Sequence, residues 1–302
     1  MADRFPKEII AKRAAAARAA EGRFEAEIGR NKEYAELTEK HRKLSSEYLF
    51  GSSRDSEAIL ADMNAAEKRI EEIRSSYTAP DICKKCSGTG YADGVVCDCV
   101  LPDIYVKCFG AEDVSSFTES FASSDPELFN GEDEIVSGKT QRDLFLIVAD
   151  NVEKYSDVVF RSKGRGLLIM GAPGLGKTFL CRSLAVKASG ERPVMYITAP
   201  ELARNFLDHR LGEPVELRYI WNAPLLIVDD LGAETCSMNV TSEYLCEMIE
   251  KRAAGKLPTV FSTNLSIEDI KNRYGERVSS RLSSDSYSAY MLFGEDIRIR
   301  RK

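Results

Sequence analysis

The spacing of apolar residues changes partway along the chain, and this change predicts two kinds of structure. Between residues 2 and 76, apolar side chains such as Ile28 and Leu44 recur at roughly helical intervals among Ala, Glu, Lys and Arg. The turn-forming run GSSRDS at residues 51–56 interrupts this pattern. We therefore expect a helical hairpin whose second helix spans Glu57–Ser75. A solvated helical tail without a partner is the alternative.

Short continuous apolar runs replace the helical spacing after residue 140. A helix pattern that begins at Thr140 leads into them. The runs are GLLIM (166–170), VMYIT (194–198), LLIVDD (225–230), TVFST (259–263) and SAYMLF (288–293). Runs of this length are typical of strands buried on both faces, and helical stretches separate most of them. This alternation predicts an α/β fold with a parallel sheet between helices.

Two further segments lie between these regions. Pro80 ends the helical pattern, and a compact cysteine-containing segment follows it. The next stretch, SSFTESFASSDPELFNGEDE, is polar, weakly periodic and rich in turn formers, which is typical of a linker. We expect a helical region at 1–79, a small cysteine module at 80–110, a linker at 111–139 and the α/β domain at 140–302.

Composition and charge restrict the function classes. The chain has 302 residues and a formal net charge of −6, so it does not coat nucleic acid through bulk positive charge, and any DNA contact must be local. Its N-terminus carries charges where a signal peptide has an apolar stretch, and no apolar run approaches the roughly 18–20 residues of a membrane span. These features predict a cytoplasmic protein with no membrane contact. Its eight cysteines would then stay reduced, so clustered cysteines indicate a metal site.

The sequence GAPGLGKT carries the strongest chemical motif in the chain. It fits the pattern G-x-x-x-x-G-K-[ST] and stands between a predicted strand and the predicted helix FLCRSLAVKA. Glycines allow such a loop to bring backbone N–H groups around a phosphate at the positive end of a helix. The residues expected to contact the nucleotide are Gly171, Ala172, Pro173, Gly174, Leu175, Gly176, Lys177, Thr178 and Phe179. In this set Lys177 would reach the β- and γ-phosphates, and the Thr178 hydroxyl would bind Mg²⁺.

Two predicted strands end in polar residues at the same edge of the sheet. LLIVDD ends in two aspartates. The carboxylate of Asp229 can hold the magnesium, and Asp230 is the candidate base that activates water. TVFSTN ends in Asn264, which can orient that water or contact the γ-phosphate, with Ser262 or Thr263 in a supporting role. Asn264 is also compatible with a simple turn residue after a strand.

Three segments together resemble the AAA+ ATPases of the DnaC/DnaI helicase-loader group and their relative, the IstB transposition helper. They are IVDDLGAE, LPTVFSTNLS and YGERVSSRL, and the resemblance runs from about Leu144 to the C-terminus. It implies a P-loop AAA+ ATPase fold with an ATP site between subunits. It also implies that Arg281 projects into a neighbour's site and that Arg298 contacts phosphate within its own subunit. Arg277 is a second candidate for a trans or structural role.

Each of these arginines also has a plainer interpretation. Arg281 can be a helix-surface residue in a salt bridge, and residues 298–302 can be a solvated basic tail. A guanidinium beside a developing γ-phosphate charge, on the other hand, lowers the barrier to transfer. The chain departs from the resemblance at Asp230, which stands where many AAA+ enzymes carry glutamate. Aspartate is one methylene shorter, so we expect slow hydrolysis.

Four cysteines form a compact pattern ahead of the predicted linker. Cys83 and Cys86 are spaced C-x₂-C, and Cys97 and Cys99 follow as C-x-C. Four thiolates at this spacing predict a structural zinc site, because so short a segment has too few apolar residues for a core of its own. Cys108 is a possible substitute ligand, and unliganded core cysteines are the competing interpretation. CKKCSGTGY also resembles the N-terminal zinc module of some DnaI-type loaders, where that end of the protein contacts the replicative helicase.

A segment between the second and third predicted strands mixes basic and aromatic residues. They are Arg204, Phe206, Arg210, Arg218, Tyr219 and Trp221. Such interleaving suits contacts to the backbone and bases of single-stranded DNA, and it suits an ordinary amphipathic helix equally well.

These inferences lead to one preferred function and two alternatives. We expect an ATP-dependent loader that places the hexameric replicative DNA helicase on single-stranded DNA, assembles with copies of itself through the ATP site, and uses ATP, Mg²⁺ and Zn²⁺. One alternative is an IstB-like transposition or phage replication helper with the same ATPase. The other is a non-hydrolysing adaptor whose shape is set by bound ATP. A simple P-loop kinase is disfavoured, because it would not need the TVFSTN and GERVSSRL segments.

Overall fold

The computed structural model describes residues 6–51, 55–235 and 240–300. The chain divides into two compact units, of which one contains Lys7–Cys97 and the other contains Asp98–Lys302. Four consecutive parts were expected from the sequence. In the structure the first three cysteines of the cluster belong to the same unit as the helices before them, and the expected linker belongs to the unit of the α/β domain.

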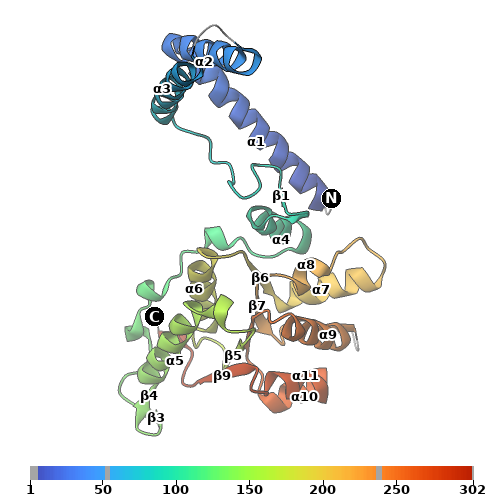
Figure 1. Ribbon diagram of the computed structural model, residues 1–302. Helices are drawn as coiled ribbons and strands as arrows, with labels where there is room; N and C mark the ends of the chain where they lie inside the picture. The colour runs from blue at the N-terminus through green and yellow to red at the C-terminus, as the bar shows by residue number, and fades with distance from the viewer. Residues whose placement is uncertain (1–5, 52–54, 236–239, 301–302) are drawn as a thin grey trace. The chain divides into compact units, whose positions relative to one another are not determined.

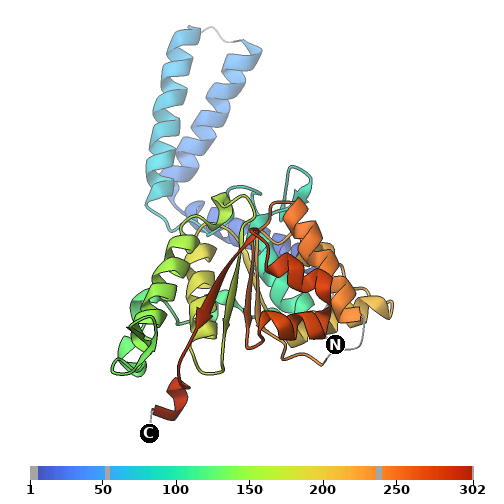
Figure 2. The ribbon, with the colours of Figure 1, turned by 90° about the horizontal axis from the view of Figure 1, so that it is seen from below.

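Three helices make up most of the first unit (Figure 1). They are α1 (Pro6–Ile28), α2 (Lys32–Phe50) and α3 (Ser56–Ser75). The expected hairpin is present as α2 and α3, which run side by side in Figures 1 and 2. The break between α1 and α2 was not predicted. There Asn31 caps α2, because its side chain accepts a hydrogen bond from the Tyr34 N–H at 3.1 Å.

Aliphatic side chains hold the helical hairpin together. Leu44 of α2 and both Ile59 and Ile73 of α3 are buried. Arg69 of α3 adds an ion pair with Glu33 of α2, in which Nε and Oε1 are 2.7 Å apart. Both side chains of this pair are about half exposed, so water screens the charges and the buried apolar surface contributes more.

A five-stranded parallel sheet forms the centre of the second unit (Figure 2). Its strands are β5 (Gly166–Gly171), β6 (Val194–Thr198), β7 (Leu225–Leu231), β8 (Thr259–Thr263) and β9 (Tyr287–Leu292). Each corresponds to one of the apolar runs found in the sequence. Their spatial order is β6-β7-β8-β5-β9, so β8 separates the strand before the glycine loop from the strand that ends in two aspartates. All five strands are parallel, so their carboxyl ends share one edge.

Helices cover both faces of this sheet (Figure 2). One face carries α5 (Gln141–Ser156) and α6 (Lys177–Ser189). The other carries α7 (Ala199–Arg210), α9 (Val240–Ala254), α10 (Ile267–Tyr274) and α11 (Glu276–Leu282). The shorter elements are β1 (Tyr91–Ala92), β2 (Val95–Val96), α4 (Leu101–Phe109), β3 (Glu134–Val136), β4 (Lys139–Thr140), α8 (Arg218–Trp221) and α12 (Ile297–Arg300). This arrangement confirms the predicted fold class.

None of the helices in the described part of the chain combines the length and the apolar character that crossing a bilayer requires.

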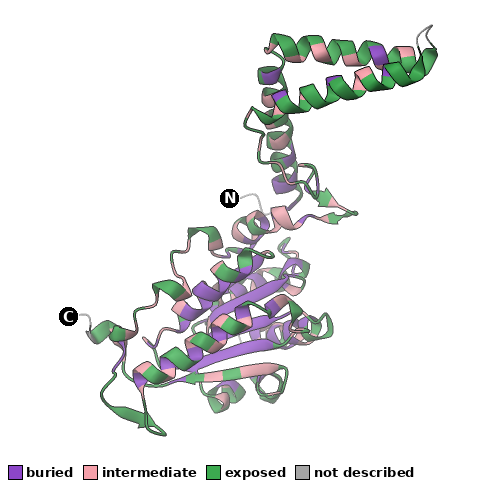
Figure 3. Ribbon diagram, turned by 60° about the vertical axis from the view of Figure 1, so that its left-hand side comes forward, coloured by how far each residue is buried: buried purple, intermediate pink, exposed green. Residues whose placement is uncertain are grey.

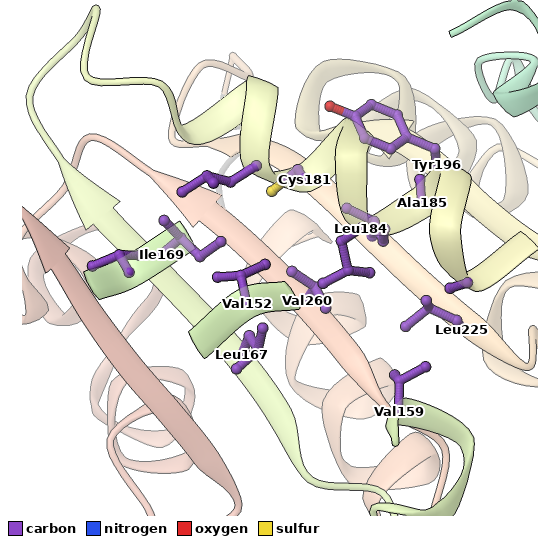
Figure 4. Packing of buried hydrophobic residues seen from close by; sticks show 14 of the residues in the cluster. Val152, Val159, Leu167, Ile169, Cys181, Leu184, Ala185, Tyr196, Leu225 and Val260 are labelled. Atoms are coloured by element: carbon purple, nitrogen blue, oxygen red, sulfur yellow. The ribbon is translucent and has the colours of Figure 1, made fainter. Parts of the chain in front are cut away.

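Apolar side chains of the sheet, α5 and α6 form one large buried cluster (Figures 3 and 4). Leu167 and Ile169 of β5 and Val260 of β8 meet Val152 of α5 and Leu184 of α6 there. Each of these five side chains is at most 1% exposed. Burial at about 25 cal/mol per Å² of apolar surface stabilises such a layer strongly, so the strand ends that carry polar residues have fixed positions.

The segment expected to be a linker packs against the α/β domain. The Glu112 N–H donates a hydrogen bond to the Tyr196 carbonyl at 2.8 Å, and Phe117 meets the Tyr196 ring edge-on at 5.0 Å between centroids. Farther along, Phe129 is buried and stacks on Phe145 of α5, with 3.9 Å between ring centroids. The apolar residues of the segment 111–139 stand singly among polar ones, and for this reason no periodicity in the sequence marked the segment as part of a domain.

Candidate nucleotide-binding site and cysteine cluster

The glycine loop joins β5 to α6 and is packed closely on two sides. Gly174 and Gly176 have φ angles of +75° and +88°, a backbone region that favours glycine. A Cβ atom on Gly174 would lie 1.8 Å from Oδ1 of Asp296, and one on Gly176 would lie 3.0 Å from the Phe145 ring. Helix α6 begins directly after this loop, at Lys177. The first N–H groups of a helix have no partners within it, so this position suits a phosphate.

Lys177 is buried, and its ammonium group donates to carbonyl oxygens of the loop itself. Nζ lies 2.8 Å from the Gly171 oxygen and 2.7 Å from the Ala172 oxygen. Burial lowers the pKa of Lys177 and outweighs the opposing effect of the carboxylates of Asp230 and Asp229. A bound phosphate would offer this ammonium charged oxygens in place of two neutral ones, which makes a stronger hydrogen bond.

Asp229, the first aspartate at the end of β7, is held by both flanking strands. Its carboxylate accepts a hydrogen bond from the Tyr196 hydroxyl of β6 at 2.7 Å and another from the Ser262 hydroxyl of β8. Burial raises the pKa of Tyr196, so its hydroxyl keeps the proton that it donates. Asp229 itself is buried. Its position is therefore determined by the sheet and not by a flexible loop.

Asp230, the second aspartate, has a different environment. Its φ angle is +58°, and the pairing register between β7 and β8 shifts here. Its N–H donates to the Ser262 hydroxyl at 2.8 Å, and its Oδ1 accepts a hydrogen bond from the Asn264 amide at 2.9 Å. Burial, together with the charge of Asp229, raises the pKa of Asp230. This carboxylate is thus better prepared to accept a proton than an ordinary aspartate.

A cavity of about 300 Å³ lies where these segments meet. Its lining residues are Pro173, Gly174, Gly176, Lys177, Thr178, Phe179, Asp230, Ser262, Asn264, Ile297 and Arg298. The structure thus brings together predicted residues from four separate parts of the sequence. Of the other expected loop residues, Gly171 and Leu175 are buried and Ala172 is exposed.

The C-terminal segment closes one side of the cavity. The Ile297 N–H donates to the Gly174 carbonyl at 3.1 Å, and the Gln141 amide donates to the Glu295 carbonyl at 2.8 Å. The Arg298 guanidinium forms a bidentate pair with Asp296, with its closest contact at 2.6 Å. Arg298 is exposed, so its guanidinium is accessible to a ligand in the cavity. The last two residues, 301 and 302, lie outside the described residues.

Arg277 and Arg281 lie on α11 and do not line this cavity. Both donate to the same oxygen of Glu250 on α9, at 3.2 Å from Arg277 and 3.3 Å from Arg281. Their side chains are 78% and 58% exposed, so these ion pairs are weak and both guanidinium groups are accessible. The salt-bridge alternative is therefore observed for Arg281, and it leaves the arginine able to reach another molecule.

The four cysteines of the predicted zinc site come together. The sulfur atoms of Cys83, Cys86, Cys97 and Cys99 all lie within 4.8 Å of one another, and those of Cys83 and Cys97 are 3.9 Å apart. Tetrahedral zinc with Zn–S bonds of about 2.3 Å requires sulfur atoms about 3.8 Å apart, so the residues fit this ion. The cluster does not use Cys108, which lies on α4.

The basic and aromatic segment has its aromatic residues turned into the domain. Phe206 is 1% exposed and stacks on Tyr244, and Tyr219 is 9% exposed. Lys251 covers the Trp221 ring, with Nζ 3.5 Å from its centroid. The buried rings of Phe206 and Tyr219 are therefore not available to stack on nucleic-acid bases, as the amphipathic-helix interpretation implied, whereas Trp221 is half-buried. The arginines of the segment, Arg204, Arg210 and Arg218, are exposed.

Some residues that shape the site were not predicted. Tyr196 contacts Asp229, Asp296 pairs with Arg298 beside Gly174, and the ring of Phe129 lies near Gly176. The position of a tyrosine within VMYIT says nothing about its neighbour in the sheet, because strand order is not encoded in the run itself. An aspartate two residues before a candidate arginine was the one available signal for the Asp296–Arg298 pair.

Part of the chain, which includes most of this site, is similar to known proteins. Residues 140–282 match the family described as IstB-like ATP binding protein. The replicative helicase loader DnaI of Bacillus subtilis (strain 168) is 30% identical over 142 residues, which are 46% of this chain and 45% of DnaI. The replicative helicase loader DnaC of Escherichia coli (strain K12) is 26% identical over 137 residues, 43% of this chain and 54% of DnaC.

The chain thus spans about half the length of the curated relatives that it matches. A crystal structure of DnaI is 23% identical, with 60% of this chain and 91% of that chain covered and a TM-score of 0.46. Residues 140–282 of this chain are thus similar to the IstB-like ATP binding protein family, and this part of the chain is also similar to the replicative helicase loaders DnaI and DnaC.

Proposed function

We propose that this protein is an ATP-dependent loader of the replicative DNA helicase, with an ATPase domain at residues 140–302. The observation that carries the proposal is the single cavity at which Lys177, Thr178, Asp230, Asn264 and Arg298 meet. These side chains supply two cations for phosphate oxygens, a hydroxyl ligand for Mg²⁺, a base, and an amide that orients it. The similarity of the domain to DnaI and DnaC supports the helicase as the client.

Each group has a defined role in hydrolysis. Lys177 and Arg298 bind the phosphates. Thr178 and Asp229 would hold Mg²⁺, which would supply positive charge beside the phosphate oxygens. Asp230 takes a proton from water as the water oxygen bonds to the γ-phosphorus and the bond to the bridging oxygen of ADP breaks. Asn264 keeps the Asp230 carboxylate oriented through their 2.9 Å hydrogen bond. Because aspartate is shorter than glutamate, the reaction is slow.

The ATP site is completed by a neighbouring copy of the chain. Arg281 does not line the cavity of its own subunit, is 58% exposed, and forms a screened ion pair with Glu250. A phosphate group in a subunit interface offers it a stronger, less screened partner. Arg281 of one subunit then stabilises the charge that develops on the γ-phosphate of the next.

A mixing experiment tests the shared site. Lys177→Ala removes the phosphate-binding ammonium, and Arg281→Ala removes the group supplied to the neighbour, so each variant alone should be inactive. Mixed in equal amounts, they should regain about a quarter of wild-type ATPase activity, because one interface in four combines an intact cavity with an intact arginine in a head-to-tail assembly. Hydrolysis by Arg281→Ala alone at the wild-type rate would refute the shared site.

The N-terminal unit, with its helices and zinc module, binds the helicase. Two large apolar side chains at the end of α2 support this assignment, since Leu49 is 73% exposed and Phe50 is 85% exposed. Exposed apolar groups of this size are typical of protein contact sites. The ATPase unit would then organise subunits on single-stranded DNA, with the protein acting in the cytoplasm.

Binding of the host's purified replicative helicase to the full chain tests this assignment. The double variant Leu49→Ser/Phe50→Ser should lose helicase binding while its affinity for ATP stays unchanged. Leu211→Ser, which alters an exposed leucine (71% exposed) of the ATPase unit, is the matched control and should bind the helicase normally. If the wild-type chain binds a transposase from the same host and not the helicase, the loader function is wrong.

A further inference from the structure

Glu234 forms a buried joint in the loop that follows β7. Its side chain is only 1% exposed. One carboxylate oxygen, Oε2, accepts a hydrogen bond from the Gly232 N–H at 3.0 Å. The other, Oε1, accepts from Arg273 Nε at 3.2 Å and from the Tyr274 hydroxyl. The Arg273 guanidinium also donates to the backbone carbonyl of Glu234.

This set of contacts gives the joint a defined geometry. A buried carboxylate is costly unless it is paired and hydrogen-bonded, and both oxygens of Glu234 have donors. Burial is the main cause of the raised pKa of Tyr274, so the tyrosine keeps the proton that it donates to Glu234. Removing the charge of Glu234 would replace a charged acceptor of the half-buried Arg273 guanidinium by a neutral one, which weakens this contact.

This joint at Glu234 connects the loop that carries Asp230 with the helices that carry Arg281. On one side, the Ala233 N–H donates to the Asp230 carbonyl at 3.0 Å, so the turn that holds Glu234 also holds the candidate base. On the other side, Arg273 and Tyr274 end α10, and Gly275 leads directly into α11. Helix α11 presents Arg281 and is anchored in the domain by buried side chains, Leu282 among them.

We propose that Glu234 is a positioning residue that ties the Asp230 loop of a subunit's own ATP site to the helix that offers Arg281 to the next subunit. The inference rests on the proposed shared site. It adds that the buried carboxylate of Glu234 helps to fix the two halves of the interface relative to each other within one subunit. Glu234 lines no part of the nucleotide cavity, so it acts on turnover and leaves ATP binding intact.

Mixed assemblies separate the effect of Glu234 on Asp230 of its own subunit from its effect on the Arg281 that is supplied to the next subunit. Glu234→Gln keeps the size of the side chain and removes its charge. It is placed either in the Lys177→Ala subunit, which supplies only the arginine, or in the Arg281→Ala subunit, which supplies only the cavity. We expect kcat of the mixture to fall at least about tenfold in both arrangements, with little change in the KM for ATP. The decisive mixture has Glu234→Gln in the Lys177→Ala subunit. If Glu234 only positioned Asp230 of its own subunit, the activity of this mixture would not change.

Controls make each outcome interpretable. Glu119→Gln alters another half-buried ion pair of the same compact unit, 2.9 Å from Arg182, and should leave the regained activity unchanged in either subunit. Tyr274→Phe removes only the hydroxyl, and should reproduce part of the loss if Glu234→Gln does not fold. If the parent mixture regains no activity, the shared site itself fails. If the parent mixture is active and neither Glu234→Gln nor Tyr274→Phe in the arginine-supplying subunit lowers kcat, Glu234 does not position Arg281.

Discussion

Asp229 and Asp230 are adjacent in the chain, yet their surroundings prepare them for different chemistry. Two hydroxyl groups donate to Asp229, and these hydrogen bonds hold its carboxylate in a fixed orientation. Asp230 lies partly buried at the cavity with a negative charge beside it, and its pKa is raised. The difference arises from the irregular backbone at Asp230, which turns the second side chain out of the strand pattern.

Replacing Asp230 with asparagine should increase stability and remove activity. A carboxyl group whose pKa is higher in the folded state stabilises the fold below its unfolded pKa of about 3.9 and loses that contribution as pH rises through the folded pKa. At neutral pH the ionised Asp230 therefore destabilises the nucleotide-free protein. Asp230→Asn should raise the thermal midpoint near pH 7, and the gain should shrink as pH approaches about 4. Loss of the base should lower kcat by about 10²–10⁴.

Asp285→Asn provides the matched control, because Asp285 is an exposed acid of the same domain. Thermal unfolding of both variants and the wild type at several pH values measures the effect. An unchanged or lower midpoint for Asp230→Asn at pH 7 would contradict the account of its raised pKa.

At the scale of elements, the glycine loop depends on a segment far from it in sequence. Residues 111–139 bring Phe129 against Phe145, and the edge of this ring stack lies beside Gly176. The stack thus supports both the α/β core and the phosphate loop. Truncation of a buried phenylalanine costs about 3–5 kcal/mol, which is large against the total stability of a domain.

Phe129→Ala should therefore lower the thermal midpoint by roughly 10 °C, since each kcal/mol shifts a domain of this size by about 2–4 °C. It should also weaken ATP binding, because the loop loses a packing partner next to Gly176. Phe293→Ala, at a side chain that is 40% exposed, should change neither property much. Equal effects of the two substitutions would show that residues 111–139 are a linker after all.

The cysteine cluster predicts a metal content that can be measured directly. Purified protein should contain about one zinc per chain, since four thiolates complete a tetrahedral site. Cys86→Ser should lose the zinc and unfold this part of the chain, because binding and local folding are coupled. Cys108→Ser should keep it, as Cys108 lies outside the cluster. Loss of zinc in the Cys108 variant would show that the ligand set is wrong.

The sequence predicts the elements well and their contacts poorly. All five strands were recognisable, because buried parallel strands are short continuous apolar runs and the glycine loop marks one strand end. The turn at GSSRDS was likewise visible from its residue types. Strand order was not, so neither the pairing of Tyr196 with Asp229 nor the joint at Glu234 could be foreseen. The aromatic residues of 111–139 were missed because they have no periodicity, and the stacking role considered for Phe206 failed because that ring faces the core.

At the scale of the whole molecule, the net charge of −6 restricts DNA binding to a local basic surface. We propose that the exposed arginines Arg204, Arg210 and Arg218 contact the backbone of single-stranded DNA. Substituting all three with glutamine should weaken binding of an oligothymidylate and reduce the salt dependence of log K by about 2, at about 0.7 per phosphate contact. An unchanged salt slope would exclude this surface.

Every role proposed above requires that the cavity bind ATP together with Mg²⁺, which calorimetric titration of the full chain with a non-hydrolysable ATP analogue measures. We expect saturable binding that requires Mg²⁺ and weakens at least about tenfold, or ~1.4 kcal/mol, in Lys177→Ala. Arg281→Ala, which alters a side chain outside its own cavity, should bind the analogue as the wild type does. Absence of binding by the wild type, or equal affinity in Lys177→Ala, would contradict the account.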